Sequence, residues 1–202
     1  MSLDRLFAPD AIALIGASAD PEKLAGRPLG YLERHGYPGD LYLVNPGRDS
    51  IDGRRCYDSI RDVPEPVDLA MVLVPAPVVA SVIEECGEAG VPFALVIASG
   101  FAEAGAEDRE AAVVDAARKS GVRVVGPNAQ GVLDLHAGVT ASFSSMLRRE
   151  DLRPGGVLRH PKWRLRRGAV PAHPEPRTRH RQVALDGERG RSRDDRGARL
   201  PG

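Results

Sequence analysis

Small residues follow the first apolar run of the sequence and form a pattern that suits phosphate binding. The run at 11–15 is followed directly by Gly16, Ala17 and Ser18. A turn of small residues lets backbone N–H groups approach a phosphate, and the N-terminus of a following helix favours anions. Ser18 adds a hydroxyl group, and either Lys23 or Arg27 adds positive charge nearby. The spacing differs from the G-x-G-x-x-G fingerprint. The pattern therefore predicts a phosphate site, with a tight turn that holds no ligand as the alternative.

The second apolar run carries information about the kind of nucleotide. It ends at Asn45 and Pro46, and Arg48 follows two residues later. A dinucleotide-binding domain places Asp or Glu near this point, where the carboxylate binds the ribose hydroxyls. An asparagine with a nearby cation argues against ordinary NAD binding and is compatible with a phosphorylated ribose. A turn with a solvated Arg48 is the alternative.

Three further apolar runs end in small or turn-forming residues. Pro75 closes the third run, where proline is structurally favourable and where its backbone is also a candidate pocket wall. Ser99 follows the fourth run. Asn128 follows the fifth run, and either hydrogen-bonds a ligand or bonds its own backbone. No histidine, cysteine or carboxylate has a partner at a spacing that predicts a catalytic or metal site.

These candidate residues need a scaffold that brings them to one edge, and the apolar pattern predicts one. The five apolar runs lie at residues 11–15, 41–44, 69–74, 93–97 and 122–125. Continuous apolar runs are typical of strands buried on both faces, as in a parallel sheet. The helical patterns between them lie at 27–35, 76–88 and 108–120, and each ends at a glycine. The alternation predicts an α/β fold, a Rossmann-like doubly wound parallel sheet, which binds ligands beyond the carboxyl ends of its strands.

The helical patterns also predict which side chains face the sheet. In the second helix these are Val78, Val79, Val82, Ile83 and Cys86. In the third helix they are Val113, Val114 and Ala117.

Composition limits the choice of partners and compartment. The 202 residues carry a formal net charge of zero, so no overall charge favours nucleic acid or a membrane as partner. No apolar run approaches the roughly 18 residues of a membrane span, and the N-terminus lacks a signal pattern. Cys56 and Cys86 stand apart, without metal-binding spacing, as is typical of a reducing compartment. We expect a cytoplasmic protein that binds neither nucleic acid nor membrane.

The last quarter of the chain differs in composition. From residue 158 onward arginine is dense and apolar residues are sparse. Such a segment buries too little apolar surface to offset the entropy of ordering, so residues 158–202 are predicted to be disordered. Clustered arginine favours phosphate contacts, but no aromatic residues alternate with the charge, which argues against a nucleic-acid site.

Taken in order, six motifs at the strand ends resemble the CoA-binding domain shared by ADP-forming acetyl-CoA synthetases and succinyl-CoA synthetase alpha subunits. Each motif alone is weak, whereas their common order is specific. They lie at residues 6–18, 42–46, 66–70, 74–76, 99–103 and 126–131, and the resemblance covers roughly residues 3–157. It implies a CoA-binding domain over 1–135 and a linker over 136–157 into a ligase domain that is missing here.

The resemblance also implies a function and its site. CoA contacts are implied at residues 16–18, at 45–48 and at Ile97, Ala98 and Ser99. The family's phosphohistidine lies in the next domain, and ATP or ADP and Mg²⁺ are used only by the full-length enzyme. The implied function is the CoA-binding domain of an ADP-forming acid–CoA ligase, catalytically incompetent alone. CoA or acyl-CoA, a ligase subunit and a second copy of the chain are the implied partners. A stand-alone CoA- or acyl-CoA-sensing module and an NAD(P)-binding Rossmann domain remain alternatives.

The sequence departs from the family after Gly156. The family continues with a strand and Thr-Gln-Ser-Gly-Ala, whereas this chain has His160-Pro161-Lys162-Trp163-Arg164. A shift of one nucleotide in the possible codons permits the family residues, and the same shift at 182–191 permits a second family segment. Residues 158–202 are therefore predicted to be translated out of frame, which resequencing of the DNA tests.

Overall fold

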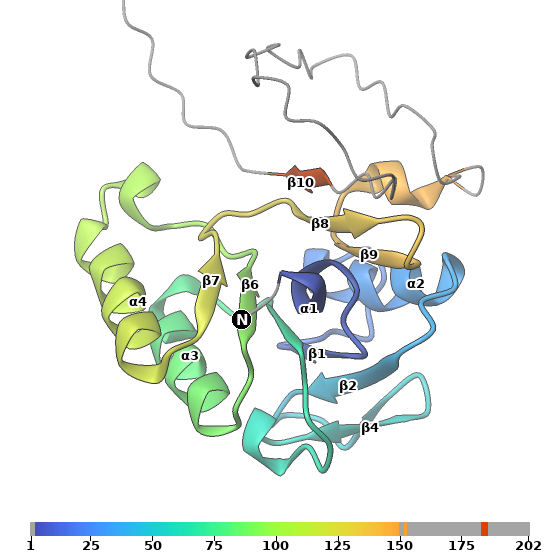
Figure 1. Ribbon diagram of the computed structural model, residues 1–202, viewed down its shortest axis with the longest axis horizontal. Coiled ribbons are helices and arrows are strands. Elements are labelled where there is room, and N and C mark those ends of the chain that lie inside the picture. Colours follow the sequence, from blue (N-terminus) through green and yellow to red (C-terminus); the bar gives the residue numbers. More distant parts are fainter. Residues whose placement is uncertain (1–2, 150–151, 153–182, 186–202) are drawn as a thin grey trace, which may run out of the picture.

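A seven-stranded sheet forms the centre of the molecule. The computed structural model describes residues 3–149, 152 and 183–185. The strands of the sheet are β1 (Ala11–Ile15), β2 (Asp40–Val44), β3 (Ser50–Ile51), β4 (Arg54–Tyr57), β5 (Leu69–Val72), β6 (Phe93–Val96) and β7 (Arg123–Val125). Their order is β3-β4-β2-β1-β5-β6-β7 (Figure 1). All neighbours are parallel except β3 and β4, which confirms the predicted parallel sheet.

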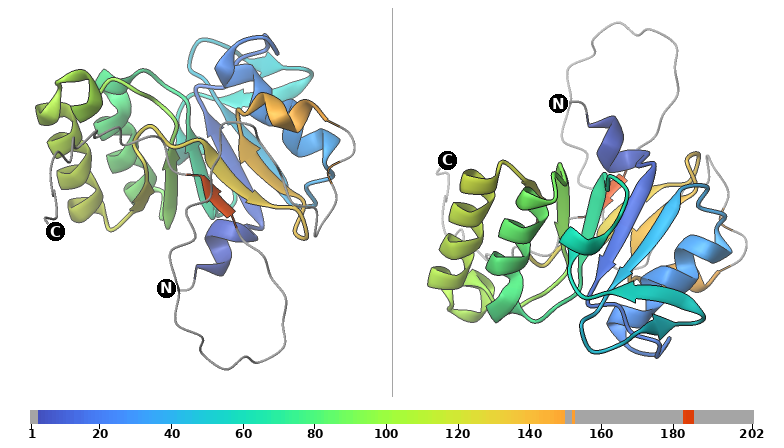
Figure 2. Two further views of the ribbon diagram at one scale, coloured as in Figure 1. Left: turned by 90° about the horizontal axis from the view of Figure 1, so that it is seen from above. Right: turned by 90° about the horizontal axis from the view of Figure 1, so that it is seen from below.

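Helices cover both faces of this sheet. They are α1 (Asp4–Phe7), α2 (Arg27–Arg34), α3 (Val79–Glu88) and α4 (Glu107–Ser120). Single 3₁₀ turns are η1 (Leu24–Gly26), η2 (Ile60–Asp62), η3 (Ala76–Val78), η4 (Ala102–Ala104) and η5 (Ser145–Arg148). The helices α3 and α4 lie together on one side of the sheet, and α2 lies on the other (Figure 2). As predicted, α4 ends at a glycine: Gly121 has a φ of 75° and its N–H bonds the carbonyl of Ala117.

The side chains of each central strand alternate between two cores. Ile12 and Leu14 of β1 join the core under α1 and α2. Ala13 and Ile15 join the core under α3 and α4. Because both faces are covered, every residue of β1 is buried, and the sequence shows a continuous apolar run instead of an alternating one. The structure thus confirms the doubly wound α/β class.

A hairpin completes the face that carries α2. It consists of β8 (Gly131–Asp134) and β9 (Val139–Ser142), which pair antiparallel. Val132, Val139 and Ala141 enter the same core as α2. A further strand, β10 (Val183–Leu185), pairs with the other edge of β8. The hairpin takes the place that a further helix would need.

The chain continues to pack beyond the hairpin. In η5, the carbonyl oxygen of Leu147 lies 2.9 Å from Nε2 of His35, and that of Arg148 accepts a bond of 3.2 Å from Arg34. The linker expected from residue 136 therefore contains β9 and η5 in its described part. The boundaries at 135 and 157 stay predictions. The predicted tail at 158–202 lies outside the described residues, apart from β10.

Two predicted inward-facing valines are exposed. Val78 is 45% exposed because it belongs to η3, before α3 begins, and so does not share the period of that helix. Val114 is 40% exposed. The buried stripe of α4 consists of Val113 and Ala116, which turns Val114 about 100° away from the sheet. The predicted orientations of Val78 and Val114 are therefore wrong.

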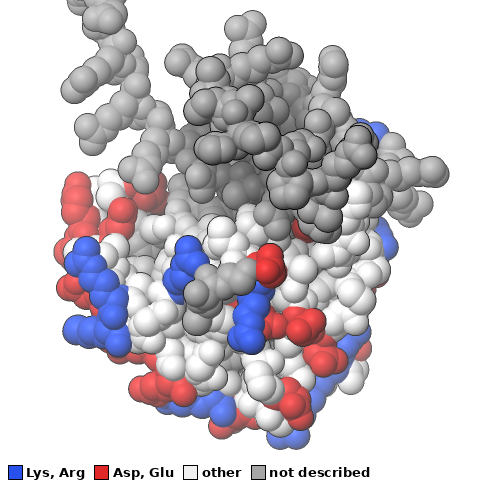
Figure 3. Space-filling view, viewed as in Figure 1, with Lys and Arg blue, Asp and Glu red and all other residues white. Residues whose placement is uncertain are grey.

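The surface mixes both signs of charge. On the face shown in Figure 3, acidic and basic side chains lie next to one another, including those over α4. Among the described residues, no helix combines the length and the apolar character needed to cross a membrane.

Candidate phosphate-binding site

The carboxyl edge of the sheet has its switch point at β1 and β5. The chain leaves β1 towards α2 on one face, and it leaves β5 towards α3 on the other face. Ligands of doubly wound sheets bind in the crevice between two such strands. The loops at 16–26 and 73–78 follow these two strands, and they hold four of the predicted site residues: Gly16, Ala17, Ser18 and Pro75.

Gly16 is required by contacts within the protein. Its φ is +86°, and a Cβ atom there would lie 2.8 Å from Cγ1 of Val74 and 3.1 Å from the backbone nitrogen of Val74. Its own N–H donates a 2.8 Å bond to the carbonyl of Val44. Gly16 therefore lets the loop after β1 contact the ends of β2 and β5. The sequence pattern was interpreted as leaving room for a phosphate near the backbone. The contacts with Val74 restrict this position more strongly than a ligand would.

The next residue carries the clearest sign of a ligand. Ala17 is 3% exposed, yet its N–H has no acceptor among the described residues. Leaving a buried donor unpaired costs about 1–3 kcal/mol, and such groups are rare in native proteins. The N–H of Ala19 also has no acceptor within the described part of the chain. These donors suit an anionic oxygen that the protein itself does not supply.

Ser18 is largely occupied by the loop. Its N–H bonds the carbonyl of Ala25 at 3.2 Å, and its Oγ accepts a 3.2 Å bond from the N–H of Asp20. The Ser18 hydroxyl still has its own proton to donate. Gly26 closes the loop so tightly that a Cβ atom would meet the carbonyl oxygen of Asp20 at 1.9 Å. The loop is thus held in one shape before any ligand arrives.

Arg27 begins α2 directly after this loop. One guanidinium nitrogen, Nη2, donates a 2.9 Å bond to the carbonyl of Glu22. Its Nε is buried and has no partner among the described residues. A positive charge and an unpaired donor therefore stand at the N-terminus of α2, where an anion is favoured.

Asn45 holds two loops together. Its Nδ2 donates a 2.8 Å bond to the carbonyl of Ala17, and its Oδ1 accepts a 3.0 Å bond from the N–H of Gly47. Both ends of the side-chain amide are therefore used within the protein. Asn45 fixes the position of Ala17, and the neighbouring Pro46 is exposed.

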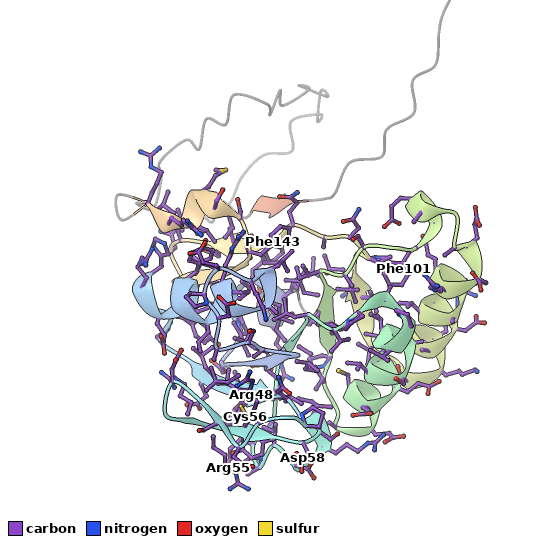
Figure 4. The ribbon with its side chains drawn as sticks, turned by 180° about the vertical axis from the view of Figure 1, so that it is seen from behind. Arg48, Arg55, Cys56, Asp58, Phe101 and Phe143 are labelled. Carbon is purple, nitrogen blue, oxygen red and sulfur yellow. The ribbon has the colours of Figure 1, made fainter. Side chains whose placement is uncertain are left out.

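Arg48 adds a positive charge after β2. It is exposed, and its guanidinium has no partner in the residues that the structure describes. Figure 4 shows Arg48 beside Cys56, whose thiol feels the charge of Arg48. Burial raises the pKa of the Cys56 thiol, and the charge of Arg48 partly offsets this rise.

The ends of β6 and β7 lie on the same edge. Ile97 is 4% exposed and its side chain is in the core, so only its backbone faces the edge. The N–H groups of Ala98 and Ser99 lack acceptors within the described chain. Asn128 has a φ of 56° and its N–H bonds the carbonyl of Ala98 at 3.0 Å. The structure therefore brings Ala98, Ser99 and Asn128 together, as the strand order requires.

The sequence analysis missed the carboxylates that shape the loop after β6. Glu103 accepts bonds from the N–H groups of Gly100 at 2.7 Å and Phe101 at 3.3 Å. The Gly100 bond in particular holds the pKa of Glu103 below its ordinary value. Glu110 accepts a 3.3 Å bond from the N–H of Ala102. A glutamate three residues after Gly100, at the spacing of a capping interaction, was the available signal.

Comparisons with known proteins identify the family of this domain. The family model described as a CoA binding domain matches residues 10–134. The alpha subunit of ADP-forming acetate–CoA ligase I from Pyrococcus furiosus is 43% identical over 149 residues, and ADP-forming acetate–CoA ligase II from Archaeoglobus fulgidus is 40% identical over 141 residues. The chain spans 32% and 21% of these two relatives, which align with 71% and 69% of it.

A solved structure shares the fold as well. It is the apo form of the dinucleotide forming acetyl-coenzyme A synthetase 1 from Ca. Korarchaeum cryptofilum, 44% identical, with a TM-score of 0.69. The similarity covers 75% of this chain and 32% of that one. With the family match over residues 10–134, the switch point and the unpaired donors of its first loop, this chain belongs to the CoA-binding domain family.

Proposed function

We propose that the chain binds CoA at the carboxyl edge of its sheet, with the pyrophosphate at the loop after β1. The observation that carries the proposal is the buried N–H of Ala17, which has no acceptor in the described residues. A pyrophosphate oxygen supplies that acceptor. The N-terminus of α2 and the charge of Arg27 favour the same anion.

We place the 3′-phosphate of CoA at Arg48. This guanidinium lies past the end of β2, next to the switch point, and the described chain offers it no carboxylate. A charge-assisted bond to phosphate is worth about 1.5–3 kcal/mol. NAD lacks a phosphate at this position, so Arg48 favours CoA over NAD.

Calorimetric titration of the full chain with CoA, dephospho-CoA and NADH tests both statements. CoA is expected to bind most tightly. Arg48→Ala is expected to weaken CoA about tenfold and to leave dephospho-CoA unchanged. Arg55→Ala is the matched control, because Arg55 is an exposed arginine that lies over the ring of Tyr57. Absence of CoA binding, or tighter binding of NADH than of CoA, overturns the proposal.

We also infer that the chain corresponds to the CoA-binding part of an ADP-forming acid–CoA ligase. The two ligases from P. furiosus and A. fulgidus support this, and the chain spans a third or less of each. ATP or ADP and Mg²⁺ would be used by the remainder of such an enzyme. The chain alone, given acetate, ATP, Mg²⁺ and CoA, is expected to bind CoA without forming acetyl-CoA. Formation of acetyl-CoA by the purified chain would contradict the inference that the chain binds CoA and that the remainder of such an enzyme carries out the reaction.

A further inference from the structure

A groove runs along α4 and the outer strand of the sheet. Its volume is about 320 Å³, and we call it the α4–β7 groove. Its lining residues are Glu110, Val113, Val114, Ala117, Arg118, Val122, Val124, Gly126 and Pro127. The strand β7 is the last in the sheet order, so its outer edge has no neighbour among the described strands. Unpaired edges of this kind readily accept another chain.

The wall of the groove includes one exposed apolar side chain. Val114 is 40% exposed, one of four large apolar side chains that stand out among the described residues. It lies in the middle of α4, which extends for 14 residues from Glu107 to Ser120. Covering Val114 together with the other apolar lining residues would remove apolar surface from water.

The two ends of α4 carry opposite charges. The first turn contains Glu107, Asp108 and Glu110, and the last turn contains Arg118 and Lys119. The dipole of a single helix favours this distribution, so the charges alone do not indicate a partner. In addition, the opposite charges of Glu110 and Arg118 are placed symmetrically about the exposed Val114, because each lies four residues from it. Figure 3 shows both signs of charge side by side over α4.

We propose that the α4–β7 groove binds the same groove of a second copy of this chain. The two copies of α4 lie antiparallel about a two-fold axis at Val114. Glu110 then faces the partner's Arg118, and Arg118 faces the partner's Glu110. A parallel arrangement would place like charges together, so the charges select the antiparallel one. This symmetric contact is self-complementary, as a two-fold interface requires.

The expected dimer is weak. An α-helix of 14 residues is about 21 Å long, and stable complexes bury about 800 Å² on each partner. One helix and a short strand edge cover less than this. Dimerisation should therefore depend on protein concentration. It does not rest on the proposed CoA site, because the groove includes none of the loops that frame the switch point.

Charge reversal gives the sharpest test, with the full chain studied by sedimentation equilibrium over a range of concentrations. Glu110→Arg and Arg118→Glu should each weaken the dimer about tenfold. The double variant should restore it, since each copy again presents opposite charges. An equimolar mixture of the two single variants should form a heterodimer, which native mass spectrometry detects by adding a mass label to one of them.

Controls separate the interface from folding. Glu110 also accepts the N–H of Ala102, so thermal unfolding must show that Glu110→Arg remains folded. Within the described part of the chain, Arg118 has no such backbone contact, and its ion pair is with Asp115 on the same helix. Val114→Lys should abolish the dimer, whereas Val78→Lys, at a valine of similar exposure, should leave it unchanged. A chain that is monomeric at every concentration, or a dimer that survives Val114→Lys, overturns the proposal.

Discussion

Ala17 and Tyr37 lie at opposite edges of the same sheet and differ in how their donors are satisfied. At the carboxyl edge, the buried N–H of Ala17 has no acceptor among the described residues. At the amino edge, the Tyr37 hydroxyl donates a 2.8 Å bond to the carbonyl of Pro9. The N–H of Asp10 there donates a 2.8 Å bond to the carboxylate of Asp68. One edge keeps donors available, and the other supplies acceptors from its own chain.

The difference comes from the loops, since the three central strands β1, β5 and β6 are buried along their whole length. Three carboxylates, those of Asp10, Asp40 and Asp68, surround Tyr37. Burial, followed by these charges, raises the pKa of Tyr37 well above its ordinary value. The amino edge therefore carries a group of carboxylates beside Tyr37. At the carboxyl edge, Arg27 and Arg48 follow β1 and β2, so the loops of the two edges differ in charge.

The largest effect is expected from Gly16→Ala. A side chain at a φ of +86° is strained, and its Cβ would lie 2.8 Å from Cγ1 of Val74. We expect a loss of about 2–4 kcal/mol in the free energy of unfolding, together with weaker CoA binding. Urea unfolding measures the first and calorimetry the second.

Gly30→Ala is the matched control for Gly16. Gly30 lies inside α2, and a Cβ there meets nothing within 4 Å. Removing a helical glycine should stabilise the protein by about 0.5–1 kcal/mol. Equal effects of the two changes would show that the loop after β1 has no special geometry, and the comparison between the edges would fail.

A smaller effect is expected from Tyr37→Phe at the amino edge. Loss of the bond to Pro9 should cost about 1 kcal/mol. The folded pKa is raised, so above pH 10 the unfolded chain loses the Tyr37 proton before the folded chain does. Tyr37 therefore makes stability fall as pH rises past about 10. Unfolding free energies measured from neutral to alkaline pH should fall less steeply in the variant, and an unchanged slope would contradict the assignment. CoA affinity should not change.

The smallest effect is expected from Glu22→Gln. Glu22 pairs with Arg148 at 3.0 Å, but both side chains are exposed, and such pairs contribute less than about 1 kcal/mol. Stability should hardly change. CoA affinity should fall by a few-fold, because the loop at 16–26 loses one of its anchors. Identical calorimetric curves for the variant and the parent would show that the Glu22–Arg148 pair does not affect the loop at 16–26.

Sequence patterns predicted the parts of the fold that are buried on both sides. The five apolar runs correspond to β1, β2, β5, β6 and β7, with ends within two residues. The hairpins β3–β4 and β8–β9 were not predicted. Their strands have two to four residues, and residues such as Arg54 and Thr140 carry no continuous apolar signal. Short strands depend on the surface that covers them, which the local sequence does not encode.

The sequence predicted where the candidate site lies, but it did not predict which polar atoms of the site stay unpaired. Strand ends located Ala17, Ser99 and Asn128 at one edge, because parallel strands point the same way. The side-chain amide of Asn45 was a candidate ligand group, but it binds the carbonyl of Ala17 and the N–H of Gly47. Contacts between loops that are distant in sequence determine which polar atoms remain free, and no local pattern reports them.

The position of η5 has a mechanical consequence. After the hairpin, the chain returns to α2, and Arg148 holds the first loop through Glu22. His35 and Arg34 hold the same turn from the other end of α2. Displacement of this turn would therefore disturb contacts at the end of α2 and at Glu22 in the first loop together.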